Sequence, residues 1–437
     1  MRVAPRRPAD GSDAALAAAG RVLLSGPALV AGFVISHGWV VLQAVLHTGE
    51  IFGDVSLYHW WARQGFSAGS WPVLHHDWVY PAAALIPVAL PAVGTSGFVA
   101  YAVGWSAMVI ALGALATWRL VRTRPRGRLA AWWWFLFLVA LGPIWLGRLD
   151  GVIAPLVLLA LLEARRRPAV ATAVATLGAW IKIAPAAVVV ALGATQRTVR
   201  GFLRDVVLPG ALVSMTVVGL ALLGGAGERA WSVFGEQRAR TLQAESVAAT
   251  WFSVARLWDP SVEIEYNRVI FTYEFAGDAA RAVASALDVL LPVAVVLIGL
   301  LSFAAARRRP ELAHDVLLLS AAATLLALIV FNKVGSPQFV AWLGPPIAAA
   351  LALAGPDARH LWSPPALGML VVGALTQILY PLEYGRFIGG DPLMVVLPAL
   401  RNVGLVALLV GALWRLGQLA LHRVPRLPAV RSAVAQP

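Results

Sequence analysis

Apolar runs of about 20 residues recur along the chain, and short arginine-rich segments separate them. The first run covers residues 22–46 and contains no formally charged side chain. A helix of this length crosses the hydrocarbon core of a bilayer. Charged residues make up 13% of the sequence, about half the share that is typical of soluble domains. The sequence therefore predicts an all-α polytopic membrane protein, with residues 1–437 forming a single integral membrane domain.

Arginine carries nearly all of the positive charge, because Lys182 and Lys333 are the only lysines. The arginines gather between apolar runs, as at 122–128, 165–167 and 307–309. Such clusters mark the cytoplasmic loops of membrane proteins and contact anionic lipid head groups. The net charge of +13 is explained in this way, so we expect membrane lipids as partners and no nucleic acid. The absence of cysteine excludes disulfides and thiol catalysis.

A topology of about twelve spans with both termini inside places every arginine cluster on the inner side of the membrane. The terminal and late loop charges that support this topology are Arg2, Arg6, Arg7, Arg21, Arg124, Asp357, Arg359 and a basic tail from Arg415 to Arg431. The expected spans are 22–46, 97–120, 129–147, 151–164, two short helices within 168–194, 205–224, 281–305, 312–331, 338–354, 363–380 and 393–414.

Residues 168–194 are predicted to form a short helical hairpin, because arginines flank them on both sides and both flanks favour the inside. The break is expected at residues 182–185, since Pro185 disfavours helix immediately before it. Each arm of about 13 residues reaches only about 20 Å. Lys182 would then lie at a recessed, outward-facing tip, where irregular backbone is tolerated only if it lines a cavity.

Two segments are predicted to face the extracytoplasmic side. Residues 47–96 form the first loop with juxtamembrane helices, among them the short apolar run 80–93. Residues 225–280 are the longest polar stretch and form the second large loop.

Asp54 follows the first apolar run and precedes Tyr58 by four residues. Its carboxylate lies at the expected lipid–water boundary, where a general base meets the head group of a lipid-linked substrate. Taken alone, Asp54 also fits a helix end in water. The pair His75 and His76 precedes Asp77, but a metal site needs further ligands of defined spacing. Interfacial hydrogen bonding, including donation to a phosphate or sugar, suits these histidines better.

The outward-facing cations are candidate phosphate ligands. Lys182 and Lys333 both fall near broken helices on the outer side, and an ammonium group suits a phosphate oxygen. For Lys333, extension of the side chain to the lipid head groups is an equal alternative. Arg148 and Asp150 lie in one tight turn, where they form either a local ion pair or part of the site.

Five ordered patterns resemble those of the GT-C glycosyltransferases, and most closely glycosyltransferase family 87, the polyprenyl-phosphate-mannose-dependent α-mannosyltransferases. Asp54 and Tyr58 match an Asp-x-x-x-Tyr pattern, and Tyr80-Pro81 matches the start of a Tyr-Pro-Pro pattern. The other matches are Gly147-Arg148-Leu149-Asp150 to a Gly-Gln-x-Asn turn, Lys182 to Pro185 to a Lys-x-x-Pro segment, and Ser336-Pro337-Gln338-Phe339 with Trp342 to a Ser-Pro-Gln-aromatic segment. Arg148 and Asp150 replace the usual Gln and Asn, and Ala82 replaces the second Pro.

The resemblance implies a GT-C-like fold whose first extracytoplasmic loop carries the catalytic Asp54. It implies inverting transfer of a sugar, mannose above all, from a polyprenyl-phosphate donor to a hydroxyl of an envelope glycolipid or glycan at the outer face of the cell membrane. Lys182, Lys333, Arg148, His75 and His76 would bind the donor phosphate. The residues implied in substrate binding are Tyr58, Tyr80, Asp150, Ser336 and Gln338.

Two other functions are alternatives to mannosyl transfer. An arabinofuranosyltransferase that uses polyprenyl-phosphate arabinose has the same implied fold. A lipid or sugar transporter is a third reading, although the chain lacks the internal repeat that such proteins favour. No metal or cofactor is assigned.

Overall fold

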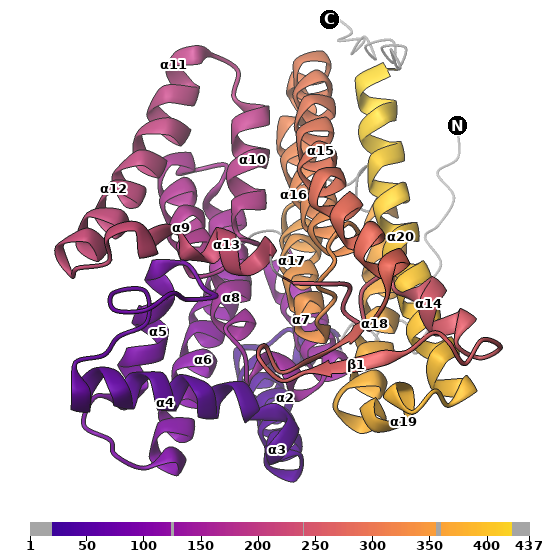
Figure 1. Cartoon of the computed structure of the whole chain (residues 1–437). Helices are drawn as coiled ribbons and strands as arrows, with labels where there is room; N and C mark the ends of the chain where they lie inside the picture. Colours follow the sequence, from indigo (N-terminus) through magenta and orange to yellow (C-terminus); the bar gives the residue numbers. More distant parts are fainter. Residues whose placement is uncertain (1–19, 124–125, 239, 355–359, 422–437) are drawn as a thin grey trace, which may run out of the picture.

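The computed structural model describes residues 20–123, 126–238, 240–354 and 360–421. This part of the chain contains seven helical segments that are long and apolar enough to cross a membrane (Figure 1). They are α2 (Gly26–Leu46), α6 (Phe98–Val121), Val199–Leu223 with α11 (Val199–Phe202) and α12 (Leu208–Leu223), α15 (Asp278–Arg308), Pro310–Val330 with α16 (Ala313–Val330), Ser363–Leu382 with α18 (Ser363–Gln377), and α20 (Pro392–Leu421). The protein is thus an all-α polytopic membrane protein.

Further apolar helices are too short to cross by themselves. They are Ala82–Ala92 with α5 (Leu85–Ala89), α7 (Gly127–Leu141), α8 (Asp150–Glu163), α9 (Pro168–Ile181), α10 (Ala186–Thr195) and Pro337–Leu353 with α17 (Gly344–Leu353). Helix length therefore supports seven spans, and a total of twelve stays a prediction. The topology charges Arg2, Arg6, Arg7, Arg124, Asp357 and Arg359, and the tail beyond residue 421, lie outside the described residues.

Arginines gather at one end of the molecule, with Arg200 in α11 and Arg307 and Arg308 in the last turn of α15. Helix α11 and the C-terminal ends of α15 and α20 lie together at the upper end in Figure 1, which we call the basic end. Helices α3 (Thr48–Ile51), α4 (Gly53–Ala68) and α19 (Tyr384–Ile388) lie at the opposite end, which we call the α4 end. An ion pair between Arg119 and Glu163 joins the last turns of α6 and α8.

The core is built around helices that are apolar on every side. All residues of α16 from Val316 to Val330 are buried, which is typical of a helix enclosed by other helices. Helix α16 packs against α10, α15 and α20, and α8 packs against α6, α9 and α17. Small residues allow this close packing. A Cβ atom at Gly344 would lie only 2.3 Å from the ring of Phe137.

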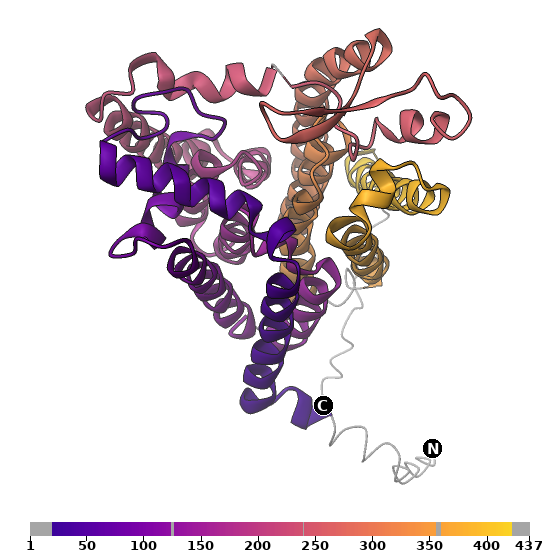
Figure 2. The same cartoon turned by 60° about the horizontal axis from the view of Figure 1, so that its bottom comes forward.

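Residues 225–280 contain the only strands in the described ranges, where the sequence predicts only a polar loop. Strands β1 (Ile264–Asn267) and β2 (Thr272–Phe275) pair antiparallel, with Ile264 opposite Phe275. The rings of Tyr266 and Tyr273 contact each other across the pair. This segment also contains α13 (Ser232–Arg238) and α14 (Thr250–Ala255). Figure 2, in which the α4 end comes forward, shows α4 on one side and the β-hairpin with α19 on the other.

Candidate functional site

Several chain reversals bring polar residues together near the α4 end. Helix α7 returns as α8 through the turn Pro143–Trp145, and α9 returns as α10 around residues 182–185. Lys182 leaves α9 in an extended conformation, and Pro185 precedes α10. A third proline break, at Pro337, precedes α17. Polar side chains at these reversals project from different helices into one region.

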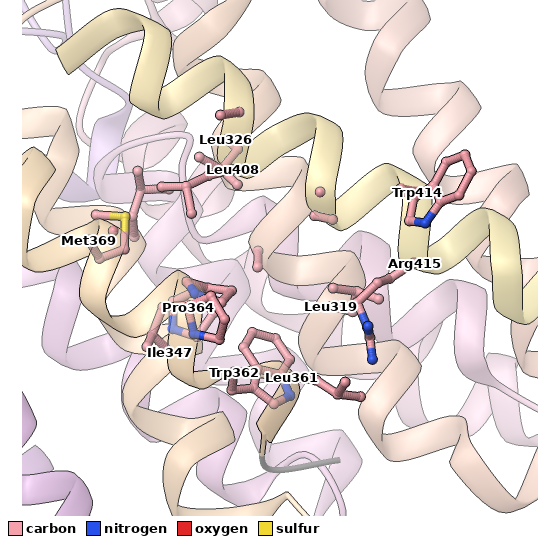
Figure 3. Close-up of a pocket in the computed structure, with 18 of the residues that line it drawn as sticks. Leu319, Leu326, Ile347, Leu361, Trp362, Pro364, Met369, Leu408, Trp414 and Arg415 are labelled. Carbon is pink, nitrogen blue, oxygen red and sulfur yellow. The ribbon is translucent and has the colours of Figure 1, made fainter. Parts of the chain in front are cut away.

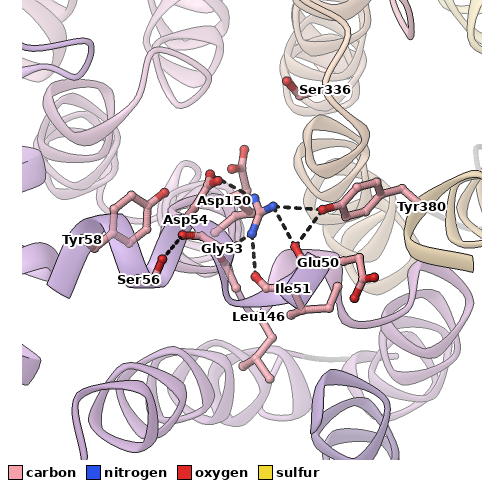
Figure 4. A network of polar contacts seen from close by, with 12 residues as sticks. Glu50, Ile51, Gly53, Asp54, Ser56, Tyr58, Leu146, Asp150, Ser336 and Tyr380 are labelled. Carbon is pink, nitrogen blue, oxygen red and sulfur yellow. Dashed lines mark hydrogen bonds and ion pairs between the residues drawn. The ribbon is translucent and has the colours of Figure 1, made fainter. Parts of the chain in front are cut away.

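Asp54 and Arg148 form an ion pair (Figure 4). Asp54 lies in the first turn of α4, and its Oδ2 is 3.0 Å from Nε of Arg148. The Arg148 side chain is 8% exposed, whereas that of Asp54 is 36% exposed. The same guanidinium donates to the carbonyl oxygens of Ile51 at 2.6 Å and Glu50 at 3.2 Å. Arg148 therefore ties the turn before α8 to the junction of α3 and α4.

Gly147 is required for this close approach. A Cβ atom at Gly147 would lie 2.0 Å from the carbonyl oxygen of Ile51, far inside contact distance. Only a residue without a Cβ lets the turn approach α3 closely enough for Arg148 to reach its carbonyl groups.

Tyr380 belongs to this network, although no sequence pattern indicates it as a site residue. Its hydroxyl donates to the carbonyl oxygen of Glu50 at 2.7 Å and accepts from Nη2 of Arg148 at 3.5 Å. Tyr380 follows α18 and lies 232 positions after Arg148 in the sequence. One feature of the sequence could have indicated Tyr380, because it is the last residue of the expected span 363–380 and lies at its outer end.

Asp150 pairs with Lys182 and not with Arg148, which corrects the local ion pair considered for the turn. Nζ of Lys182 donates to both carboxylate oxygens of Asp150, at 3.0 and 2.7 Å. Nε1 of Trp342 donates to the same carboxylate at 2.6 Å. Asp150 is fully buried, and the Lys182 ammonium also lies 4.8 Å from the ring centre of Phe339.

Tyr58 and Tyr80 form an aromatic wall beside Asp54. Their hydroxyl oxygens are 3.4 Å apart, and the Tyr58 ring packs against Trp105. Burial raises the pKa of Tyr58 well above its ordinary value, and the nearby Tyr80 and Asp54 raise it further. Burial likewise raises the pKa of Tyr80. Both phenols therefore stay protonated at neutral pH, and one of the two hydroxyl protons is donated within the pair.

Lys333 lies in a different polar cluster. Its ammonium pairs with Asp288 at 2.8 Å and donates to the carbonyl oxygen of Arg238 at 3.1 Å. Ser336 donates to Oε1 of Gln243 at 3.3 Å. Among the described residues, neither Lys333 nor Ser336 has a hydrogen bond or ion pair with the Asp54–Arg148 or Asp150–Lys182 pairs. The expectation that Lys333 lines the same site thus has no contact to support it.

Gln338 and the two histidines also lie outside these pairs. Gln338 is half-buried and has no hydrogen-bond partner in the described part of the chain. Nδ1 of His75 accepts from the Trp71 amide at 3.0 Å, and the carbonyl oxygen of His76 accepts from the Val73 amide at 2.9 Å. These contacts shape the loop after α4. Over the described ranges, no three His, Cys, Asp or Glu residues are grouped so as to hold a metal.

The two ion pairs leave specific atoms available for chemistry. Oδ1 of Asp54 has no hydrogen-bond partner among the described residues, while Oδ2 is fixed by Arg148. A carboxylate held in this way can accept a proton from a substrate hydroxyl. An ammonium group has three donors, so the Lys182 contacts with one carboxylate leave capacity for an anionic oxygen.

Comparisons of the chain with protein-family models, with curated proteins and with solved structures find no match.

Proposed function

We propose that the protein is an inverting glycosyltransferase that moves a sugar, mannose above all, from a polyprenyl-phosphate donor to a hydroxyl of an envelope glycolipid or glycan. The observation that carries this proposal is the geometry of Asp54, whose one oxygen is fixed by Arg148 and whose other oxygen is free. The sequence patterns that resemble those of family 87 supply the donor class.

The proposed reaction is a single displacement. The acceptor hydroxyl transfers its proton to Oδ1 of Asp54 while its oxygen attacks the anomeric carbon. The bond between that carbon and the phosphate oxygen breaks, and polyprenyl phosphate leaves with the electron pair. The N–H donor that Lys182 keeps free stabilises the charge that develops on the phosphate. Arg148 contributes only its positive charge, because its five N–H groups already contact Asp54, Tyr380 and backbone carbonyl oxygens. Tyr80, which is partly exposed, is placed to bind the sugar, and the buried Tyr58 holds it through the contact between the two hydroxyls.

In this proposal, the α4 end faces the extracytoplasmic side of the cell membrane. The arginines at the opposite end support this orientation, because cytoplasmic loops carry the excess of positive charge. The lipid tail of the donor would then stay in the bilayer, and its sugar would reach Asp54 at the surface.

The test uses membranes that contain the protein, radiolabelled polyprenyl-phosphate mannose and native envelope acceptors. Asp54→Asn is expected to lower label transfer by about 10²- to 10⁴-fold, the contribution typical of a general base. Glu50→Gln is the matched control, because only the backbone carbonyl of Glu50 has a contact in the Asp54 network. Equal transfer by the wild type and Asp54→Asn would eliminate Asp54 as the base. Transfer from the arabinose donor alone would change the assigned sugar.

A further inference from the structure

A large apolar cavity lies between α16, α17, α18 and α20, away from the Asp54 network (Figure 3). Its volume is about 880 Å³, near the upper end of the range for small-molecule sites. Side chains such as Leu319, Ile347, Met369 and Leu408 line its length. A cavity with these walls excludes polar ligands over most of its length and accepts a hydrocarbon chain.

One end of the cavity is polar. Arg415 from α20 and Asp315 from the first turn of α16 both line it. The Arg415 side chain extends from α20 toward Trp362 and Leu361 in Figure 3. Among the described residues, Arg415 has neither an ion pair nor a hydrogen bond, although it is half-buried. A cation left unpaired at the end of an apolar cavity favours a ligand with a negative group there.

The length of the cavity matches one leaflet of a bilayer. The lining residues of α20 run from Gly404 to Leu419, and Arg415 lies in the last two turns of this helix, whose C-terminal end is at the basic end. At 1.5 Å per residue, the distance from Gly404 to Arg415 is about 16 Å. This equals about half of the 30 Å hydrocarbon core. Arg415 therefore lies near head-group depth if Gly404 lies near the midplane.

We propose that this cavity binds one hydrocarbon chain of a zwitterionic glycerophospholipid from the leaflet at the basic end. The lipid phosphate pairs with Arg415, and the ammonium of its head group lies toward Asp315. Arg415 and Asp315 give the mouth of the cavity one cation and one carboxylate. This combination complements a zwitterionic head group better than it complements a head group that carries only negative charge. The site is separate from the proposed glycosyl transfer, because its polar end lies at the end of the molecule opposite α4.

The test quantifies lipid that stays bound after purification. The protein is reconstituted into vesicles of equal phosphatidylethanolamine and phosphatidylglycerol, re-extracted in mild detergent, and analysed by native mass spectrometry. The wild type is expected to retain phosphatidylethanolamine in preference to phosphatidylglycerol. Arg415→Gln should lower retention about fivefold, the effect of one basic contact at a membrane surface. Arg415→Lys should restore it.

A filling variant tests the apolar part of the cavity. Gly411 lines the cavity, and a Cβ atom there would meet no other atom within 4 Å. Gly411→Leu is therefore expected to abolish lipid retention with little change in the melting temperature. Gly417→Leu is the matched control on the same helix, because Gly417 has the same open surroundings but does not line the cavity. Equal retention by the wild type, Gly411→Leu and Arg415→Gln overturns the proposal, and a preference for phosphatidylglycerol overturns the head-group assignment.

Discussion

At the residue scale, the two aspartates of the site have different surroundings. Asp150 is fully buried and receives N–H donors from Lys182 and Trp342. Asp54 is partly exposed and keeps one oxygen free beyond its pair with Arg148. Carboxylates in contrasting environments commonly have separate roles in catalysis. We therefore infer that Asp54 contacts the substrate, while Asp150 holds Lys182 in position.

The ion pair between Asp150 and Lys182 leads to a prediction about the stability of the fold. Asp150→Asn leaves the Lys182 ammonium without its counter-charge, and breaking a buried pair costs about 3–5 kcal/mol. Thermal melting in detergent should show a large decrease for this variant. Adding Lys182→Met removes the unpaired charge and should recover much of the loss, whereas sugar transfer should stay lost. Additive effects of the two substitutions on the melting temperature would contradict the pairing.

The buried Glu245 leads to a prediction about how the stability of the protein depends on pH. This side chain is 3% exposed, and burial raises the pKa of its carboxyl despite a hydrogen bond from Tyr384 and the nearby Arg401. Because the folded-state pKa lies above the unfolded one, the folded protein binds more protons between the two values. The contribution of Glu245 to stability is therefore most favourable below about pH 4.5 and is lost as pH rises through the folded pKa.

Glu245→Gln does not ionise, so its melting temperature should rise relative to that of the wild type as pH increases from 4 to 8. Each unit of pKa elevation corresponds to about 1.4 kcal/mol. Glu265→Gln, at an exposed position in β1, is the control and should show no such trend. A constant difference between Glu245→Gln and the wild type across this range would exclude the buried-carboxyl effect.

At the element scale, the positions of the helix breaks could be predicted from local chemistry, but the side-chain contacts at these breaks could not. Proline and the arginines on both flanks indicate a break before Pro185 from sequence alone. The partner of Lys182 is 32 residues away, and only the packing of α8 against α9 brings it close. The β-hairpin was missed for a similar reason, because two four-residue strands carry little pattern within a charged segment.

The close approach of α3 to the turn before α8 leads to a prediction about a substitution at Gly147. Gly147→Ala forces the two segments apart, because the new Cβ would overlap the carbonyl oxygen of Ile51. We expect a loss of about 1–3 kcal/mol, as for other overpacked sites, and reduced transfer through displacement of Arg148. Gly53→Ala is the matched control, since a Cβ there meets no atom within 4 Å. Equal melting temperatures for Gly147→Ala and the wild type would refute the close approach.

At the scale of the whole molecule, the site and the lipid cavity lie toward opposite ends of one helical core. Arg148 contacts Asp54 of α4, whereas Arg415 lies in the last two turns of α20 at the basic end. The length and apolar character of α2, α6, α15 and α20 could be read from the sequence. The number of crossings could not, because α9 and α10 are each shorter than a bilayer is thick.

Labelling of single cysteines decides how α9 and α10 are arranged across the membrane. The chain has no native cysteine, so a membrane-impermeant maleimide reports only the introduced residue. If α9 and α10 form a hairpin, Arg166→Cys and Arg200→Cys label from the same side, and Ser67→Cys in α4 labels from the other. All three positions are exposed. Inside-out and right-side-out vesicles distinguish the two sides. Labelling of positions 166 and 200 from opposite sides would mean that the two helices cross as one span, and the net positive charge of both flanks would then need a different explanation.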